Sequence, residues 1–478
     1  MGVITEVPIG SFDPERFKNV LDGDRYSAFQ AAILRAQDVF AGRIVWNVNS
    51  TARGGGVAEL LRSLLAYAHG AGVDARWLVI DGAPEFFSVT KRIHNNLHGA
   101  PGDGGTLGAS ESVIYQSVMD RNAAELTSLL RDNDVVILHD PQTAGLCLPS
   151  KDAAGAVIWR CHVGLDTPNE HARRAWDFLR PLVGHADGYV FSRRAFAWEE
   201  LENDKIVVIP PSIDAFSPKN QDLDPSTVQS ILATAGLIDA TPEAAASFLR
   251  EDGSPGTVVR TATFHDGGAP PPENVPLVVQ VSRWDRLKDP LGVIEGFATY
   301  VAPHTDAHLI MAGPDVKAVN DDPEGAEVLE ESLAKWETMP EPTRERIHLV
   351  LLPMDDGEEN AAMVNALQRR AAVVVQKSLA EGFGLTVSEA MWKARPVVAS
   401  RVGGIQEQII DGKTGLLLDD AHDLRKFGGL VTDLLNDPRR AAMIGAEAQG
   451  RIREDFLGPR HLIQYLELIS KLLNVRPS

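Results

Sequence analysis

Short apolar runs alternate with helix-like patterns along most of the chain from about residue 43. The first run, RIVWNVN at 43–49, is followed by an amphipathic helical pattern at 57–72. Further apolar runs predict strands at 75–80, 134–140, 156–162, 188–192 and 205–210. Continuous apolar strands separated by crossover helices are typical of parallel sheets that are covered on both faces. The first part of the chain therefore predicts a doubly wound α/β domain.

The pattern breaks at PPSIDAFSPKN and then starts again. The second series predicts strands at 276–282, 307–313, 347–353, 371–376 and 396–400. Two such series predict two Rossmann-like domains with doubly wound parallel sheets that face a cleft. We expect an N-terminal domain at 1–211, a C-terminal domain at 212–457, and a last helix at 458–478 that packs back on the N-terminal domain. Residues 251–275 are rich in Gly and Pro, which predicts an exposed insertion or loop.

The composition is that of an ordinary soluble globular enzyme, with 44% hydrophobic and 23% charged residues among 478. No apolar run approaches the roughly 20 residues that a membrane-spanning helix needs. The first residues lack the basic start and apolar stretch of a signal peptide. Two cysteines, Cys147 and Cys161, do not make a disulfide framework in so long a chain. We therefore expect a cytoplasmic protein.

The formal net charge of −20 limits the partners of this chain. Such a surface repels polyphosphate chains, so we expect no nucleic acid and no anionic membrane as a partner. A small anionic ligand can still bind where a local group of donors overrides the overall field. Three segments at the ends of predicted strands offer such donors.

The first segment, STARGGGVAEL at 50–60, lies between the first predicted strand and its helix. Gly54, Gly55 and Gly56 let the backbone approach a ligand closely and adopt positive φ. The N-terminus of the helix presents free N–H groups to an anion. The segment matches neither the G-x-G-x-x-G dinucleotide pattern nor a Walker loop. A flexible turn is the plainer interpretation, and the position at the end of the first strand favours a ligand site.

The second segment, VSRWDRLKDP at 281–290, follows the first strand of the second domain. Arg283 and Lys288 lie at the carboxyl end of that strand, where open sheets bind ligands. Together they can hold a diphosphate, the guanidinium as a planar fork and the ammonium as a mobile point charge. The alternative is a solvated pair of cations in a loop.

The third segment, at 377–400, is the most specific. Glu381 precedes a tight turn, and Glu389 follows eight residues later inside the predicted helix. The turn and helix start can present backbone N–H groups to a phosphate, and the residues concerned are Gly382, Phe383, Gly384, Leu385 and Thr386. The two carboxylates can accept hydrogen bonds from hydroxyls at opposite ends of a sugar nucleotide. The alternative role for two glutamates near a helix start is stabilisation of the helix dipole.

Polar residues also end two strands of the first domain. His139 and Asp140 end one predicted strand and His162 ends the next, which places all three at the same edge of the sheet. A histidine at a strand end is often structural. No H-E-x-x-H, paired C-x-x-C or Asp-rich loop is present in the sequence, so we expect no metal site.

These residues resemble the retaining glycosyltransferases of the two-Rossmann-domain (GT-B) type, in particular the E-x7-E group. The run from Glu381 to Glu389 is similar to the signature of that group, and Arg283, Lys288 and His162 match its diphosphate pair and its strand-end histidine. A closer resemblance, over nearly the whole chain, is to the trehalose synthases. It rests on NVNSTARGGGVAELL, EFFSVTKRIHNNLHG, LHDPQ, WRCHVGLDTPN, VSRWDRLKDP, DDPEG and the block at 377–418.

The resemblance implies a retaining transfer of glucose from a nucleoside diphosphate glucose to glucose, which forms α,α-trehalose. Arg283 and Lys288 would neutralise the departing diphosphate, Glu389 would hold the ribose, and Glu381 with the turn amides would hold the glucose hydroxyls. The remaining implied donor-binding residues are Gly54, Gly55, Gly56, Gly382, Phe383, Gly384, Leu385 and Thr386. The implied catalytic residues are His162, Glu381 and Asp140, and the implied acceptor-binding residues are Asn49, His139 and Asp140.

Other activities stay open on the sequence. A trehalose phosphorylase would share the basic pair and the E-x7-E run, and would use phosphate in place of the nucleotide. Another small sugar could be the acceptor, and Arg53, Arg193 and Arg194 could supply cations for glucose 6-phosphate. A non-catalytic sugar-nucleotide sensor on the same fold is a more distant alternative. The resemblance implies no required cofactor, and it leaves open the nucleotide base, a stimulation by Mg²⁺ and a homodimer.

Overall fold

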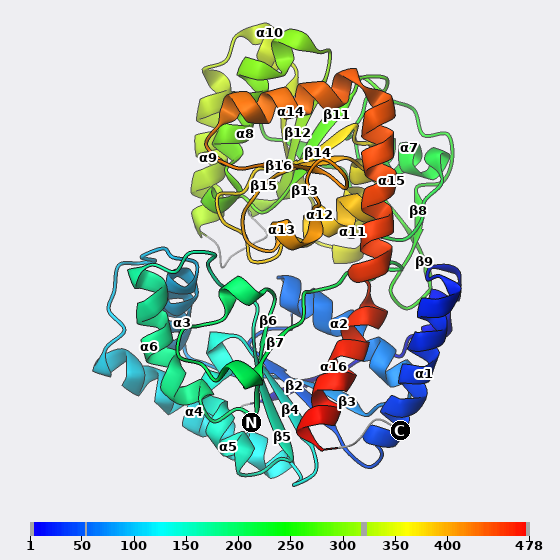
Figure 1. Ribbon diagram of the computed structural model, residues 1–478. Helices are drawn as coiled ribbons and strands as arrows, with labels where there is room; N and C mark the ends of the chain where they lie inside the picture. Colours follow the sequence, from blue (N-terminus) through cyan, green and yellow to red (C-terminus); the bar gives the residue numbers. More distant parts are fainter. Residues whose placement is uncertain (1–3, 53–54, 317–322, 475–478) are drawn as a thin grey trace. The chain divides into compact units, whose positions relative to one another are not determined.

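The computed structural model of the chain describes residues 4–52, 55–316 and 323–474. It divides into two compact units, which Figure 1 shows in the colours of the sequence. Unit 1 holds the chain up to Ser212 together with the segment from Phe456 onward, and unit 2 runs from Ile213 to Asp455. Within the described residues, each unit is built around one seven-stranded sheet.

The sheet of unit 1 has the strand order β1-β3-β2-β4-β5-β6-β7. Its strands are parallel except β1, which pairs antiparallel with β3. The central strands are buried along their whole length, as expected for a parallel sheet that is covered on both faces. The strands are β1 (Thr5–Val7), β2 (Val45–Asn49), β3 (Ala75–Val79), β4 (Val135–His139), β5 (Ala156–Cys161), β6 (Gly188–Phe191) and β7 (Ile206–Val208).

Helices cover this sheet, and several begin at side-chain caps. The Asp22 carboxylate accepts from the N–H of Arg25 at the start of α1, and the Asn169 side chain accepts from the N–H of Ala172 at the start of α6. The C-terminal helix α16 returns to unit 1 and packs against α1 and α2. The helices are α1 (Gly23–Val39), α2 (Gly56–Gly70), α3 (Pro84–Leu97), α4 (Ala109–Leu129), α5 (Cys147–Lys151), α6 (Glu170–Val183) and α16 (Gly458–Leu472).

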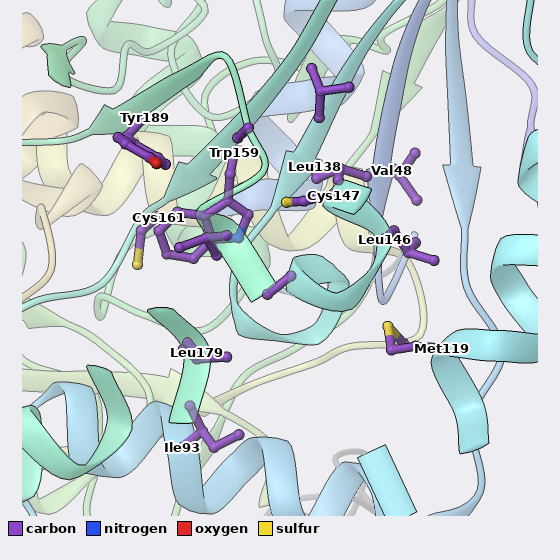
Figure 2. Packing of buried hydrophobic residues seen from close by; sticks show 14 of the residues in the cluster. Val48, Ile93, Met119, Leu138, Leu146, Cys147, Trp159, Cys161, Leu179 and Tyr189 are labelled. Carbon is purple, nitrogen blue, oxygen red and sulfur yellow. The ribbon is translucent and has the colours of Figure 1, made fainter. Parts of the chain in front are cut away.

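The largest core of unit 1 lies between the sheet and helices α3 to α6. Figure 2 shows Trp159 of β5 and Leu138 of β4 packed with Leu146, Cys147 and other apolar side chains. Trp159 is fully buried and its indole N–H donates to the carbonyl of Asp140. Cys147 and Cys161 are free, buried thiols, and burial raises the pKa of both, so they act as small apolar core residues.

The sheet of unit 2 has the strand order β10-β13-β12-β11-β14-β15-β16. It is parallel except at β10, which pairs antiparallel with β13. The strands are β10 (Thr263–Phe264), β11 (Leu277–Val281), β12 (His308–Pro314), β13 (Ile347–Leu352), β14 (Val373–Gln376), β15 (Val397–Ser400) and β16 (Leu416–Leu418). The helices are α7 (Pro225–Thr234), α8 (Pro290–Tyr300), α9 (Pro323–Glu337), α10 (Glu341–Arg344), α11 (Gly357–Arg370), α12 (Leu385–Trp392), α13 (Ile405–Gln408), α14 (Leu424–Asn436) and α15 (Pro438–Asp455).

The predicted α/β class and the two parallel sheets are confirmed, and each strand predicted from an apolar run is present within a few residues. The prediction of an exposed insertion or loop at 251–275 is correct in part, since most of these residues are exposed or half-buried and lie outside strands. This segment holds β9 (Pro255–Thr257), which pairs with β8 (Ser247–Leu249), and it also holds β10. Val258 is buried, and Arg260 forms an ion pair with the buried Glu359 of α11. Short strands with little apolar periodicity left no signal in the sequence.

Each sheet contains a point at which the strand order reverses. In unit 1 the chain adds β3 on one side of β2 and β4 on the other, and in unit 2 it adds β12 on one side of β11 and β14 on the other. Open α/β sheets bind ligands outside the carboxyl ends of the strands at such a point. Candidate ligand sites therefore lie in the loops that follow β2 and β4 in unit 1, and β11 and β14 in unit 2.

Candidate active site

The loops after β11 and β14 of unit 2 meet through a side-chain ion pair. Lys288 Nζ lies 2.5 Å from Glu381 Oε2, and both side chains are largely buried. The Ser378 hydroxyl donates to the same carboxylate oxygen at 3.2 Å, and the N–H of Leu379 donates to the carbonyl of Leu287 at 2.8 Å. The structure therefore brings together two of the residues that the sequence singled out, although 93 positions separate them.

Arg283 lies on the same loop after β11 but has a different partner. Its Nη2 lies 2.5 Å from Asp285 Oδ2, and its side chain is 57% exposed. Asp285 also accepts from the N–H of Leu287 and so caps the short 3-10 helix Arg286–Lys288. Arg283 is therefore the more accessible cation of the pair, and each of the two is held by a carboxylate, Arg283 by Asp285 and Lys288 by Glu381.

The turn after Glu381 is shaped by glycines. Gly384 has φ of 84° and caps α12, and the ring of Phe383 is buried beneath the turn. Gly403 has φ of 49°, and a Cβ on it would lie 1.7 Å from the carbonyl oxygen of Glu381. Gly404 donates its N–H to the carbonyl of Gly382. Only glycine fits so close an approach, so the Glu381 loop is braced by the backbone at 403–404.

The first residues of α12 are Leu385 and Thr386, whose backbone N–H groups lie in the first helical turn. The Thr386 hydroxyl donates to Gln376 Oε1 at the end of β14. Glu389 lies further along α12, is 2% exposed, and has Lys219 Nζ at 3.5 Å from its Oε1. Lys219 was not predicted from the sequence, because the break at 210–220 shows no pattern that distinguishes it from a solvated lysine.

In unit 1 the ends of β4 and β5 carry a connected group of polar side chains. His139 Nδ1 lies 3.2 Å from His162 Nε2, and the two rings stack. Arg160 donates from Nε to His162 Nε2 at 3.0 Å. His139 Nε2 lies 3.1 Å from Asn47 Oδ1. The structure therefore brings His139 and His162 together, and it adds Asn47 and Arg160, which the sequence analysis did not select.

A signal for these two residues exists in the sequence. Asn47 and Arg160 each interrupt a run of apolar residues inside a predicted buried strand, where a polar side chain is costly unless it has partners. Both are buried in the structure. Tyr465 and His461 of α16 complete the group, since Arg160 Nη1 donates to the Tyr465 hydroxyl at 2.8 Å and the rings of His461 and Tyr465 stack.

Asp140 links the two strand ends. Its Oδ1 accepts from the backbone N–H of His162 at 2.7 Å, and its own N–H donates to the carbonyl of Arg160 at 2.7 Å. Its backbone has φ of 65° and ψ of 179°, a region that is essentially restricted to glycine. Burial raises the pKa of the Asp140 carboxyl to about 6, although the bond from His162 and the charge of Arg160 oppose the shift.

The histidines of this group are neutral near pH 7. Burial, followed by the charge of Arg160, lowers the pKa of His139 to about 3. The same two causes, with His139 and His461 in addition, hold the pKa of His162 well below its usual range. Neutral imidazoles can donate or accept one hydrogen bond at each ring nitrogen without carrying charge. The histidines of the group therefore offer uncharged hydrogen-bonding nitrogens at the strand ends. Arg160 carries the permanent positive charge of the group.

The loop after β2 is only partly described. Gly54 and Arg53 lie outside the described residues. Gly55 has φ of 80° and caps α2, of which Gly56 is the first residue. Asn49 is buried, accepts from the indole N–H of Trp77 at 2.8 Å and donates to the carbonyl of Thr51 at 2.7 Å. The structure thus places Asn49 beneath the loop, and the hydrogen bonds of its side chain go to Thr51 and Trp77 rather than to His139 or Asp140.

The described ranges offer neither a metal centre nor a membrane-spanning helix. No group of three or more His, Cys, Asp or Glu side chains is arranged to hold a metal ion there. Among the same residues, every helix is too short or too polar to span a bilayer.

Comparison with known proteins identifies both units. Residues 47–198 match the family model described as trehalose synthase, N-terminal domain, and residues 263–451 match that of glycosyl transferases group 1. A trehalose synthase of Pyrococcus horikoshii is 34% identical over 471 residues, which cover 98% of this chain and 99% of that protein. A trehalose synthase of Rubrobacter xylanophilus is also 34% identical, with coverage of 96% and 97%.

Solved structures share the fold. An E. coli structure described as trehalose-6-phosphate bound with UDP-2-fluoro glucose has a TM-score of 0.66 at 14% identity, with coverage of 91% of this chain and 100% of that one. The chain has two parallel α/β units, each with candidate ligand-binding loops at its point of strand reversal. Together with these matches, this architecture defines a glycosyltransferase of the GT-B type. The chain belongs to the trehalose synthase family. It is therefore a glycosyltransferase of trehalose metabolism.

Proposed function

We propose that this chain transfers glucose from a nucleoside diphosphate glucose to free glucose, with retention of configuration, and forms α,α-trehalose. The observation that carries the donor half is the ion pair of Lys288 with Glu381, 2.5 Å apart at the strand-order reversal of unit 2. A sugar diphosphate carries anionic oxygens next to hydroxyl groups. A cation beside a carboxylate complements both kinds of group at once.

In this proposal the loops of unit 2 bind the donor. Arg283 and Lys288 neutralise the charge that develops on the departing diphosphate, which lowers the barrier to cleavage. The carboxylate of Glu381 accepts hydrogen bonds from glucose hydroxyls, and backbone N–H groups of the turn at 382–386 hold phosphate oxygens. Glu389 holds the ribose, with Lys219 beside it. The E. coli structure described as bound with UDP-2-fluoro glucose supports a nucleotide sugar as the class of donor.

The strand ends of unit 1 act on the two sugars. Asp140, with a pKa of about 6, is largely ionised at pH 7.5 and can accept a hydrogen bond from the acceptor hydroxyl. In this proposal His162 is the neutral polar group that faces the donor sugar. His139 holds the His162 ring through the 3.2 Å contact between their ring nitrogens. Asn49 holds the start of the Gly-rich loop, whose Gly55 and Gly56 allow a close backbone approach.

The proposed step requires neither a metal ion nor a cofactor. The bond between glucose C1 and the diphosphate oxygen breaks, and a bond from C1 to the acceptor oxygen forms on the same face. The acceptor proton passes to the departing phosphate oxygen. The cationic pair has the part that a divalent ion has in metal-dependent transferases.

The experiment is a donor and acceptor matrix. UDP-, ADP- and GDP-glucose are each incubated with glucose or glucose 6-phosphate, and release of the nucleoside diphosphate is measured with EDTA and with Mg²⁺. We expect release with glucose as acceptor and substantial activity in EDTA. Strict dependence on glucose 6-phosphate, or complete loss in EDTA with recovery in Mg²⁺, would contradict the proposal. Glucose 1-phosphate formed from trehalose and phosphate alone would identify a phosphorylase instead.

A further inference from the structure

Unit 1 contains a cavity of about 100 Å³ between its sheet and helices α1, α2 and α16. Figure 1 shows where these three helices lie along the chain. Apolar side chains of the three helices form most of its wall, among them Ala32, Ala36, Leu61, Leu65, Leu466 and Ile469. Five polar residues also line it: Asn47, His139, Arg160, His461 and Tyr465. Hydrogen bonds and ring stacking connect these five residues, directly or through His162, so the polar part of the wall is continuous.

Two buried polar atoms of this wall have no hydrogen-bond partner among the described residues. They are Nδ2 of Asn47 and Nε2 of His461, in side chains that are 3% and 0% exposed. The hydroxyl of Ser212 lies 3.0 Å from Nδ1 of His461 and can donate to it, which leaves the proton of the neutral ring on Nε2. An unpartnered buried N–H is costly, and native proteins usually satisfy such groups with water or a ligand.

The wall also carries a buried positive charge. Arg160 is fully buried, and its terminal nitrogens bond to the hydroxyl of Tyr465 and the carbonyl of Ile209. Within the part of the chain that the structure describes, it has no carboxylate as a salt-bridge partner. Burial raises the pKa of Asp140 and the charge of Arg160 opposes that shift, but the Asp140 carboxylate accepts its hydrogen bond from the backbone N–H of His162 and not from Arg160. Buried charges are normally paired, so this wall favours an added anion.

We propose that this cavity binds a short-chain aliphatic monocarboxylate, with its carboxylate on Arg160, Asn47 and His461 and its tail between α1, α2 and α16. The three polar residues all have N–H groups to donate, and a carboxylate is an acceptor only. The apolar wall fits an alkyl tail and would leave a sugar or phosphate without partners. An apolar cavity of about 150 Å³ accommodates benzene, so about 100 Å³ suits a tail of roughly four carbons.

This site is separate in chemistry from the donor loops of unit 2, and its test does not depend on the proposed transfer reaction. The full-length protein, without sugar nucleotide, is titrated with pentanoate by isothermal titration calorimetry at pH 7.5. We expect saturable binding of one pentanoate per chain. Pentan-1-ol and pentylamine keep the tail but lack the anionic head, and acetate keeps the head but lacks the tail. Each of the three should bind at least tenfold more weakly than pentanoate.

A pair of variants on α1 locates the site. Ala36→Leu extends a wall residue into the cavity and should weaken pentanoate binding at least tenfold. Ala31→Leu makes the same change at an exposed position of the same helix and should bind like the wild type. Equal binding of pentanol and pentanoate would overturn the carboxylate assignment. No saturable binding of pentanoate, or equal binding by the two variants, would overturn the site itself and leave ordered water as its occupant.

Discussion

The backbone N–H of His162 donates a 2.7 Å hydrogen bond to the Asp140 carboxylate. The bond joins the ends of the neighbouring strands β4 and β5 and holds Asp140 in a backbone conformation with φ of 65° and ψ of 179°. Such a conformation costs on the order of 1–3 kcal/mol in a residue other than glycine. Strained residues of this kind gather at functional sites, so Asp140 is the residue of unit 1 that most directly tests the proposed function.

The first prediction concerns the pH dependence of activity. Burial raises the pKa of Asp140 to about 6, and only the ionised form offers the acceptor hydroxyl a charged, and therefore strong, hydrogen-bond acceptor. The kcat/KM for glucose should therefore fall about tenfold per pH unit below about pH 6. In Asp140→Asn, kcat/KM should be low and should no longer show this acidic limb. An unchanged limb in the variant would assign the titration to another group.

The second prediction concerns the free energy of unfolding of the same variant. The folded pKa of about 6 lies above the unfolded value of about 3.9, so the folded state binds a proton that the unfolded state lacks between these pH values. The Asp140 carboxyl therefore makes the free energy of unfolding decrease as the pH rises through this range. The decrease is complete above about pH 6. Asp140→Asn should gain about 1–3 kcal/mol relative to the wild type on going from pH 4 to pH 8. Urea unfolding at both pH values measures this difference, and an equal difference at both would contradict it.

The third prediction concerns the cationic pair of unit 2. Lys288→Ala and Arg283→Ala should each lower kcat/KM for the nucleotide sugar roughly tenfold or more, because a charge-assisted hydrogen bond is worth about 1.5–3 kcal/mol. Arg286→Ala is the matched control on the same loop, since Arg286 pairs with Glu331 at the surface. The control should retain wild-type kinetics. Steady-state kinetics of the three variants decide the matter, and near-normal values for both test variants would remove the pair from the donor site.

The fourth prediction concerns the glycine that braces the Glu381 loop. A Cβ at Gly403 would lie 1.7 Å from the Glu381 carbonyl oxygen, so Gly403→Ala must displace that loop. We expect kcat/KM to fall by about tenfold or more, as for a misplaced substrate-binding group. Gly429→Ala serves for comparison, because a Cβ there meets nothing within 4 Å. If Gly403→Ala has the kinetics of Gly429→Ala, the position of Glu381 does not matter for the reaction.

The pairing of Lys288 with Glu381 illustrates what the sequence could predict. Each residue follows an apolar strand, and the carboxyl ends of parallel strands share one edge of a sheet. The apolar runs predicted β11 and β14, and the strand order of the sheet makes them neighbours. A shared edge of the sheet was therefore predictable for the two loops, whereas the pairing of β11 with β14 and the ion pair itself come from the structure.

The contacts of Arg160 illustrate what the sequence could not predict. A buried arginine inside a strand signals the need for partners, but Tyr465 lies 305 positions further along the chain. Only the return of α16 to unit 1 brings it there. Arg260 is a second example, since its partner Glu359 belongs to α11 and the segment between β9 and β10 has no periodic pattern. Long-range pairs of this kind leave no local signal.

The measurement that tests the central claim most directly is proton NMR of the product formed from the preferred nucleoside diphosphate glucose and free glucose. The proposed reaction predicts a non-reducing disaccharide whose two anomeric positions are equivalent, with the coupling of an α linkage, in an amount equal to the nucleoside diphosphate released. A reducing disaccharide, a β linkage, or release of the nucleoside diphosphate with only free glucose as product would contradict it.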